Sequence, residues 1–142
     1  MIEVQNLTKR YPTQVAVSDV TFSVREGEIL GFLGPNGAGK TTTMRVLTGF
    51  LPPSSGTARI AGHDVVRQSR EARASIGYLP ESAALYGEMR VREYLRFRAK
   101  LEGVSGAEVG KRVDDAIGRC LLEEVADRKV KGYSGGMKRR LD

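Results

Sequence analysis

The chain has 142 residues, 40% of them hydrophobic and 28% charged, and its formal net charge is +6. This composition is that of an ordinary soluble domain, and no apolar run approaches the roughly 20 residues of a membrane-spanning helix. A single cysteine, Cys120, excludes an internal disulfide. The positive charge fits either an anionic partner such as nucleic acid or a basic surface around a phosphate site. Charge runs are usually solvated faces, which favours the second interpretation.

The N-terminal segment has patterns typical of strands. Residues 2–8 and residues 14–24 alternate between apolar and polar side chains, the second with Val20 and Phe22 at period two. Each segment therefore predicts a half-buried strand. The apolar run at 29–33 follows a turn and predicts a further strand. We expect an antiparallel β layer beside a mononucleotide-binding core.

The letters GPNGAGKT at residues 34–41 fit the phosphate-binding P-loop pattern, and a helix-compatible run follows at 41–48. The glycines let successive backbone N–H groups converge on an anion, and the start of the next helix adds donors and partial positive charge. Lys40 can reach the outer phosphates, and Thr41 can ligate Mg²⁺. The alternative, a glycine-rich turn with a surface lysine, leaves the flanking pattern unexplained. The motif predicts a nucleoside triphosphate site.

The rest of the chain begins with short elements and becomes helical. A strand is predicted at 57–61, a helix at 65–74 and a buried strand at 75–79. From about residue 82 to 131 the apolar spacing is helical, which predicts a helical subdomain. One helix of that subdomain is expected to begin with a capping box at Ser105. Its apolar stripe consists of Val109, Val113, Ala116, Ile117, Cys120 and Leu121.

The letters YSGGMKRR occupy residues 133–140. Two interpretations stay open for the serine and the two glycines. They can form a turn in which Ser134 caps a helix, or they can offer a hydroxyl and free backbone N–H groups to a second phosphate. The presence of a P-loop upstream favours the phosphate site.

These two motifs, in this order, resemble those of the ATP-binding cassette (ABC) ATPases, whose signature is usually LSGGQ. The resemblance implies an α/β fold: a P-loop NTPase core with an antiparallel β layer and an inserted helical subdomain. It divides the chain into a nucleotide-binding core at 1–81, a helical subdomain at 82–132, and the signature with the start of a helix at 133–142. The letters IGYLPE at 76–81 are similar to those in ATPase subunits of bacterial export-type (ABC-2-like) transporters.

The resemblance also implies site residues for ATP and Mg²⁺. Tyr11 matches the aromatic side chain that stacks on adenine. Ser134, Gly135 and Gly136 match the signature that clasps the γ-phosphate of an ATP held by the opposite subunit. Lys40 and Glu81 match catalytic positions, and Thr41 and Glu81 match metal ligands. The residues matching the triphosphate cradle are Gly34, Pro35, Asn36, Gly37, Ala38, Gly39, Lys40, Thr41 and Thr42.

The sequence departs from the family pattern in three places. Glu81 stands where the family usually has glutamine; a carboxylate can ligate Mg²⁺, but its charge repels a γ-phosphate. Tyr133 and Met137 replace the usual leucine and glutamine of the signature. The sequence also ends before the family's Walker B strand and its Asp-Glu pair. We therefore expect a fragment in which the predicted strand at 29–33 lacks a neighbour, and which binds Mg·ATP weakly and hydrolyses it negligibly.

The function implied by the resemblance is ATP binding and, in the complete domain, ATP hydrolysis that powers export. The expected partners are a transmembrane permease, as a separate polypeptide, and a second ATPase subunit in a head-to-tail dimer; no nucleic acid is expected. The expected location is the cytoplasm, peripheral to the inner face of the cell membrane. One alternative is a soluble ABC ATPase acting on nucleic acid or the ribosome, and another is a non-hydrolysing remnant. A P-loop GTPase or kinase is disfavoured, because the guanine-reading Asn-Lys-x-Asp is absent and the signature would be unexplained.

Overall fold

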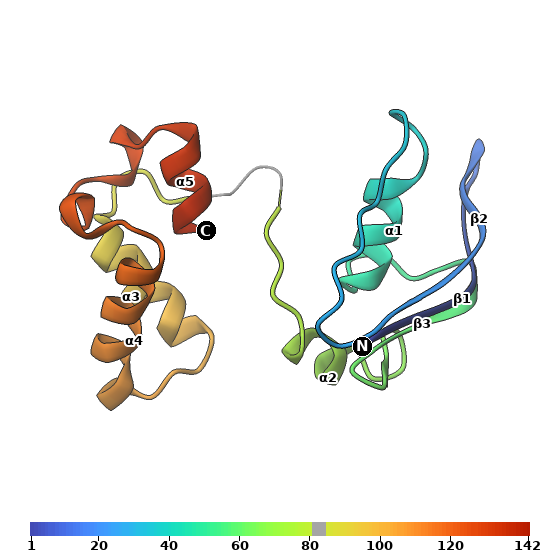
Figure 1. The fold of residues 1–142 in the computed structure, drawn as a ribbon, viewed down its shortest axis with the longest axis horizontal. Helices are drawn as coiled ribbons and strands as arrows, with labels where there is room; N and C mark the ends of the chain where they lie inside the picture. The colour runs from blue at the N-terminus through green and yellow to red at the C-terminus, as the bar shows by residue number, and fades with distance from the viewer. Residues whose placement is uncertain (81–84) are drawn as a thin grey trace. The chain divides into compact units, whose positions relative to one another are not determined.

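The computed structural model of the chain describes residues 1–80 and 85–142. These residues form two compact units, Met1–Tyr78 and Leu79–Asp142. As Figure 1 shows, the strands belong to the first unit and the second is built of helices. Among the described residues no helix is long and apolar enough to cross a lipid bilayer.

The first unit is built on an antiparallel sheet with the strand order β2-β1-β3-β4. Its strands are β1 (Ile2–Tyr11), β2 (Gln14–Val24), β3 (Ser55–Ile60) and β4 (His63–Asp64). The predicted strands at the N-terminus are confirmed, and β1 runs on to Tyr11. The ladder between β1 and β2 shifts register at three places. Such irregularities bend a strand and increase its twist.

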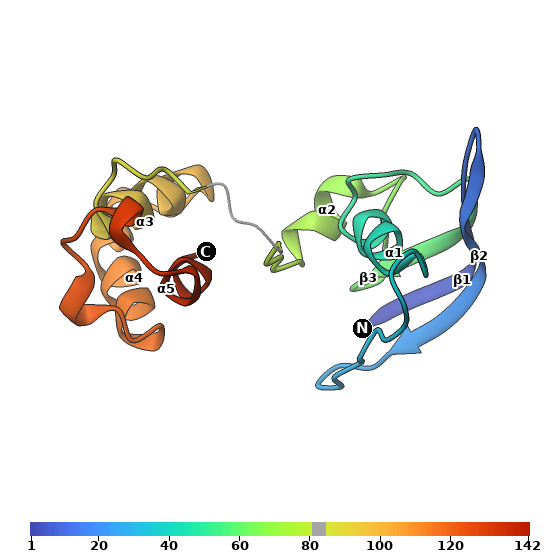
Figure 2. The ribbon, with the colours of Figure 1, turned by 90° about the horizontal axis from the view of Figure 1, so that it is seen from above.

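Two helices complete the first unit, α1 (Lys40–Leu47) and α2 (Ser69–Ala74). The helix predicted after the P-loop is confirmed as α1, whereas the helix predicted at 65–74 is confirmed only over α2. Figures 1 and 2 show α1 lying against the sheet, and its Val46 and Leu47 are buried in a cluster with side chains of β1 and β3. Burying each such side chain contributes roughly 1.5–3 kcal/mol. This packing fixes the start of α1, and with it the end of the preceding loop.

The second unit contains α3 (Val91–Leu101), α4 (Gly106–Arg119) and α5 (Gly135–Leu141). Its core draws on all three helices and on the segment between α4 and α5. The signature residues therefore fold with the helical unit. The buried members of the core are Val91, Tyr94, Val109, Val113, Ile117, Leu122, Ala126, Val130, Tyr133 and Leu141.

The apolar stripe predicted for α4 is confirmed from Val109 to Cys120 and wrong at its last member, Leu121. Because α4 ends at Arg119, Leu121 lies beyond the helix with a φ of 52° and is 72% exposed, while Leu122 is buried in its place. The predicted capping box is also wrong in detail. Ser105 precedes the helix, but its hydroxyl donates to the Glu108 carboxylate at 3.3 Å instead of accepting from the backbone.

The predictions of strands at 29–33 and 75–79 are wrong, and both segments are irregular in the structure. A strand needs a neighbour that satisfies its backbone N–H and C=O groups, and no described segment pairs with either one. The alternation of side chains at 29–33 nevertheless persists. Phe32 packs edge-on against Phe22 of β2 with ring centroids 5.2 Å apart, while Leu33 is 93% exposed.

Candidate nucleotide-binding site

The loop before α1 contains glycines in a backbone conformation that other residues rarely adopt. The angle φ is 87° at Gly37 and 85° at Gly39. A Cβ atom at Gly37 would meet open space, whereas one at Gly39 would lie 2.3 Å from the carbonyl oxygen of Ala16 in β2. Gly37 therefore lets the loop curl, and Gly39 lets the end of the loop approach the sheet closely.

The side chain of Lys40, the first residue of α1, folds back over this loop. Its Nζ donates hydrogen bonds to the carbonyl oxygens of Gly34 at 2.6 Å and Pro35 at 2.8 Å. The ammonium is therefore held at the loop, while Asn36 and Ala38 between its partners and the helix are exposed. The structure thus brings the predicted loop residues and the predicted lysine together at the start of one helix.

The first turn of α1 adds further binding capacity. Its N–H groups have no acceptors within the helix, and the helix dipole places partial positive charge there. Thr41 is exposed and Thr42 half-buried. Within the described residues no cluster of three or more His, Cys, Asp or Glu side chains could hold a metal. An exposed Thr41 hydroxyl fits Mg²⁺, because that ion commonly combines few protein ligands with substrate phosphates and water.

Tyr11, the predicted base-stacking residue, lies at the end of β1 and pairs with Gln14 across the hairpin to β2. Its side chain is 36% exposed, and the Lys9 ammonium lies over one face of the ring, 5.6 Å from the centroid. Figure 1 shows the β1–β2 hairpin and the loop before α1 at the same end of the first unit. An exposed aromatic ring at that end is available for stacking.

Ser134 caps α5, and its Oγ accepts a hydrogen bond from the Met137 N–H at 3.3 Å. The capping interpretation is therefore confirmed. A Cβ atom built on Gly135 or on Gly136 would meet nothing within 4 Å. The backbone at these two glycines is thus open to an approaching group, as the second interpretation requires.

The unusual tyrosine of the signature has a structural explanation. Tyr133 is 5% exposed and belongs to the core of the helical unit. Its hydroxyl donates a hydrogen bond to the carbonyl oxygen of Val125 at 2.7 Å, and burial raises its pKa. Tyr133 therefore fills an apolar position and finds a partner for its one polar group. Glu81, the remaining predicted site residue, lies outside the described residues.

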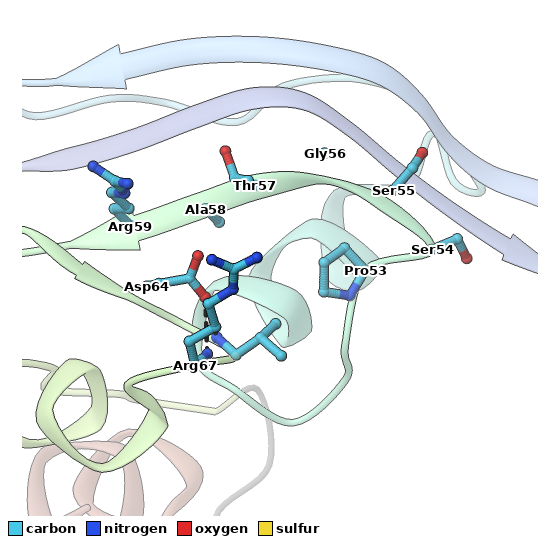
Figure 3. A pocket seen from close by; sticks show the side chains of 10 residues that line it. Pro53, Ser54, Ser55, Gly56, Thr57, Ala58, Arg59, Asp64 and Arg67 are labelled. Atoms are coloured by element: carbon cyan, nitrogen blue, oxygen red, sulfur yellow. Dashed lines mark hydrogen bonds between the residues drawn. The ribbon is translucent and has the colours of Figure 1, made fainter.

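A hollow away from the P-loop lies at the edge of the sheet, lined by residues between Pro53 and Arg67 (Figure 3). Asp64 accepts hydrogen bonds at 2.9 Å from the backbone N–H groups of Arg67 and Val66. These bonds, led by the one from Arg67, hold the pKa of Asp64 below its ordinary value. The carboxylate is therefore engaged by its own turn, and the residues lining the hollow include none of the predicted nucleotide ligands.

Thr43 has a structural role that the sequence motifs do not indicate. This side chain is 2% exposed, and its hydroxyl donates to the carbonyl oxygen of Gly39 at 3.0 Å. The third threonine of the run after Lys40 is thus inside the fold, whereas Thr41 is at the surface. A helical period starting at Lys40 could have indicated this, because Thr43, Val46 and Leu47 fall on one face.

A glycine-rich loop that leads into a helix, with a lysine held at the loop, defines a P-loop nucleotide-binding protein. The chain belongs to the ABC transporter family, whose sequence pattern matches residues 17–142. The linearmycin resistance ATP-binding protein LnrL of Bacillus subtilis is 36% identical over 142 residues, covering 100% of this chain and 46% of that protein. The Nod factor export ATP-binding protein I of Ralstonia nicotianae is 39% identical over 141 residues, covering 99% of this chain and 44% of that protein.

The fold is also found among solved structures. The dimeric, post-hydrolysis state of an ATP-binding cassette bound to ADP and Pi matches with a TM-score of 0.83 and 25% identity. The match covers 99% of this chain and 66% of that one. The chain spans about half the length of the curated relatives it matches. The fold class predicted from sequence, a P-loop NTPase core with an antiparallel β layer and a helical subdomain, is confirmed.

Proposed function

We propose that the chain binds ATP with Mg²⁺ at residues 34–42, and that the whole protein hydrolyses this ATP to power export through a separate membrane subunit. The observation that carries the proposal is the position of Lys40. Its ammonium is bonded to the carbonyl oxygens of Gly34 and Pro35 at the N-terminus of a helix. Membership of the ABC transporter family supports ATP as the nucleotide.

The chemistry of binding follows from these contacts. A triphosphate entering the loop meets backbone N–H groups and the partial positive charge of α1. Lys40 then exchanges two bonds to neutral carbonyl oxygens for bonds to phosphate oxygens. The phosphate oxygens carry negative charge and the carbonyl oxygens do not, so Coulomb attraction to the ammonium favours the exchange. Thr41 would hold the Mg²⁺, which would neutralise charge on the phosphates.

Tyr11 stacks on the adenine ring. Stacking of a base on an aromatic side chain contributes about 1–3 kcal/mol and tolerates any base. The exposed ring at the hairpin supports this role, and the Lys9 ammonium on its other side leaves one face for the base. Glu81 would help to hold the Mg²⁺ and to orient the water for attack on the γ-phosphate.

The signature completes the site across a dimer. Ser134, Gly135 and Gly136 bind the γ-phosphate of an ATP held by a second, head-to-tail copy. The open backbone at the two glycines supports this role, as does the dimeric state of the related cassette bound to ADP and Pi. In the complex the Ser134 hydroxyl turns from the Met137 N–H to the phosphate.

The transport role is supported by the relatives. LnrL is a resistance ATP-binding protein, and the Nod factor relative is an export ATP-binding protein. We propose that this chain likewise serves an exporter, peripheral to the inner face of the membrane and bound to a permease. We expect no nucleic-acid partner, and the pairing of Lys129 and Lys131 with Glu88, each at 3.0 Å, supports this by offsetting part of the basic charge near the C-terminus.

Calorimetric titration of the 142-residue chain with Mg·ATP tests the central step. Lys40→Ala should weaken binding by about 10- to 150-fold, the value of a hydrogen bond to a charged group. Lys111→Ala is the matched control, because it removes the same charge from the exposed surface of α4. Equal affinities for the original chain and the Lys40→Ala variant would contradict the proposal.

A further inference from the structure

The carbonyl group of Gly39 is held by a double interaction. It accepts a hydrogen bond from the Thr43 backbone N–H at 2.8 Å and another from the Thr43 hydroxyl at 3.0 Å. Thr43 is 2% exposed, so water does not compete for either bond. The direction of this carbonyl is therefore fixed along the axis of α1.

The fixed carbonyl determines the direction of a phosphate-binding group. In a trans peptide unit the C=O and the next N–H point in opposite directions, and the peptide bonds of the described chain are trans. When the Gly39 carbonyl points down the helix toward Thr43, the Lys40 N–H points out of the helix toward the loop. Thr43 thus sets the direction of the Lys40 N–H without forming a hydrogen bond to it.

The other side of Gly39 rests against β2. A Cβ atom built on Gly39 would lie 2.3 Å from the carbonyl oxygen of Ala16 and 3.1 Å from the Cγ2 atom of Val17. Val17 is 5% exposed and cannot yield without disturbing the sheet. Gly39 is therefore enclosed between Thr43 of α1 and Val17 of β2.

We propose that Thr43 and Val17 are positioning residues of the nucleotide site, which lock the Gly39–Lys40 peptide so that its N–H faces the triphosphate. The inference rests on the proposed function and deepens it. Thr43 acts through the phosphate donor alone, so its effect is the same for ATP and for inorganic tripolyphosphate. Val17 belongs to the strand that the hairpin joins to Tyr11, so it also ties the phosphate cradle to the adenine side.

The test compares Thr43 of α1 with Thr48, the residue that caps the C-terminal end of the same helix. Thr48 is 7% exposed, and its hydroxyl bonds the carbonyl oxygen four residues earlier, at Met44, at 2.8 Å. Thr43→Val should weaken binding of Mg·ATP and magnesium tripolyphosphate by one common factor, about 2- to 10-fold, the value of one neutral hydrogen bond. Thr43→Ser keeps the hydroxyl and should bind like the original chain. Thr48→Val removes the same kind of bond without touching Gly39 and should leave both affinities unchanged.

A second pair of variants tests the contact between Gly39 and β2. This pair remains informative if Thr43→Val fails to fold. Val17→Ala should weaken tripolyphosphate binding, whereas Val24→Ala, at the other end of β2 and 8% exposed, should not. Wild-type affinity in Thr43→Val, or equal losses in the Thr43 and Thr48 variants, overturns the inference. If Lys40→Ala leaves the affinity for Mg·ATP unchanged, the proposed function is overturned instead. The two failures are therefore distinguishable.

Discussion

The two units of this chain differ in how completely they cover their apolar residues. The helical unit buries a cluster drawn from α3, α4, α5 and the segment between them. In the first unit several large apolar side chains stay exposed, in the segment before the P-loop, on or just after α1, and in the segment after α2. The exposed residues in question are Ile29, Leu30, Leu33, Met44, Phe50 and Tyr78.

The difference follows from how each kind of element satisfies its backbone. A helix makes its hydrogen bonds internally, so three amphipathic helices close a core by burying one face each. A strand takes its hydrogen bonds from a neighbour, so the apolar run at 29–33 covers one face through Phe32 and leaves the other open. The helical unit thus closes its core with local contacts, whereas the run at 29–33 has no paired strand among the described residues.

The largest effect is expected in the core of the helical unit. Tyr94 is 2% exposed, and truncation of a buried aromatic residue costs about 3–5 kcal/mol. Tyr94→Ala should lower the helical circular dichroism signal while leaving Mg·ATP binding in place. Leu101→Ala, at a 66% exposed position of the same helix, is the control and should change little. Loss of ATP binding in the Tyr94 variant would show that the units depend on each other.

A smaller effect is expected at the P-loop glycines. Gly37→Ala meets open space and should cost only the strain of a left-handed residue, about 1–2 kcal/mol. Gly39→Ala carries the same strain and also places a Cβ 2.3 Å from the Ala16 carbonyl oxygen, so the loop must move. Chemical denaturation should rank Gly39→Ala as the more destabilised variant, with the weaker ATP binding. The reverse ranking would mean that the loop does not rest on β2.

Exposed and half-buried residues of the run at 29–33 should respond in opposite ways. Ile29 and Leu33 are 97% and 93% exposed, so replacing both by serine should change the unfolding free energy by no more than about 0.5 kcal/mol. The same change should reduce self-association in sedimentation velocity, since exposed apolar patches drive association. Phe32→Ser, which removes the contact with Phe22, should destabilise the unit. A marked loss of stability in the double variant would mean that the two residues are covered.

The smallest effect concerns charge on the helical unit. Hydrogen bonds from Lys131 and Lys129 lower the pKa of Glu88. A carboxyl whose pKa is lower in the folded chain stabilises it above the unfolded pKa, and this contribution is lost as the pH falls through the folded pKa. Titration followed by NMR should show a Glu88 pKa below the ordinary value, and Lys131→Met should raise it. An unchanged Glu88 pKa in that variant would refute the pairing.

Local patterns in the sequence predicted the structure correctly. The pattern at 34–41 located the loop that Lys40 and Gly39 form, and the helical spacing of Val109, Val113 and Ile117 located one face of a core. The prediction at 29–33 is wrong because strand formation there depends on a tertiary partner. The local pattern does not indicate whether a neighbouring strand is present. The role of Thr43 is also not predicted, since no motif distinguishes a buried hydroxyl aimed at Gly39 from the exposed one of Thr41.

Hydrogen exchange of the 142-residue chain with and without Mg·ATP tests most directly the claim that the nucleotide binds in the first unit. Slow exchange in α3 and α4 should be the same in both states, because their core is complete without ligand. Added Mg·ATP should slow exchange at residues 34–43 and at the hairpin that carries Tyr11. Protection that appears only in the helical unit, or no change at residues 34–43 under saturating Mg·ATP, would contradict the account.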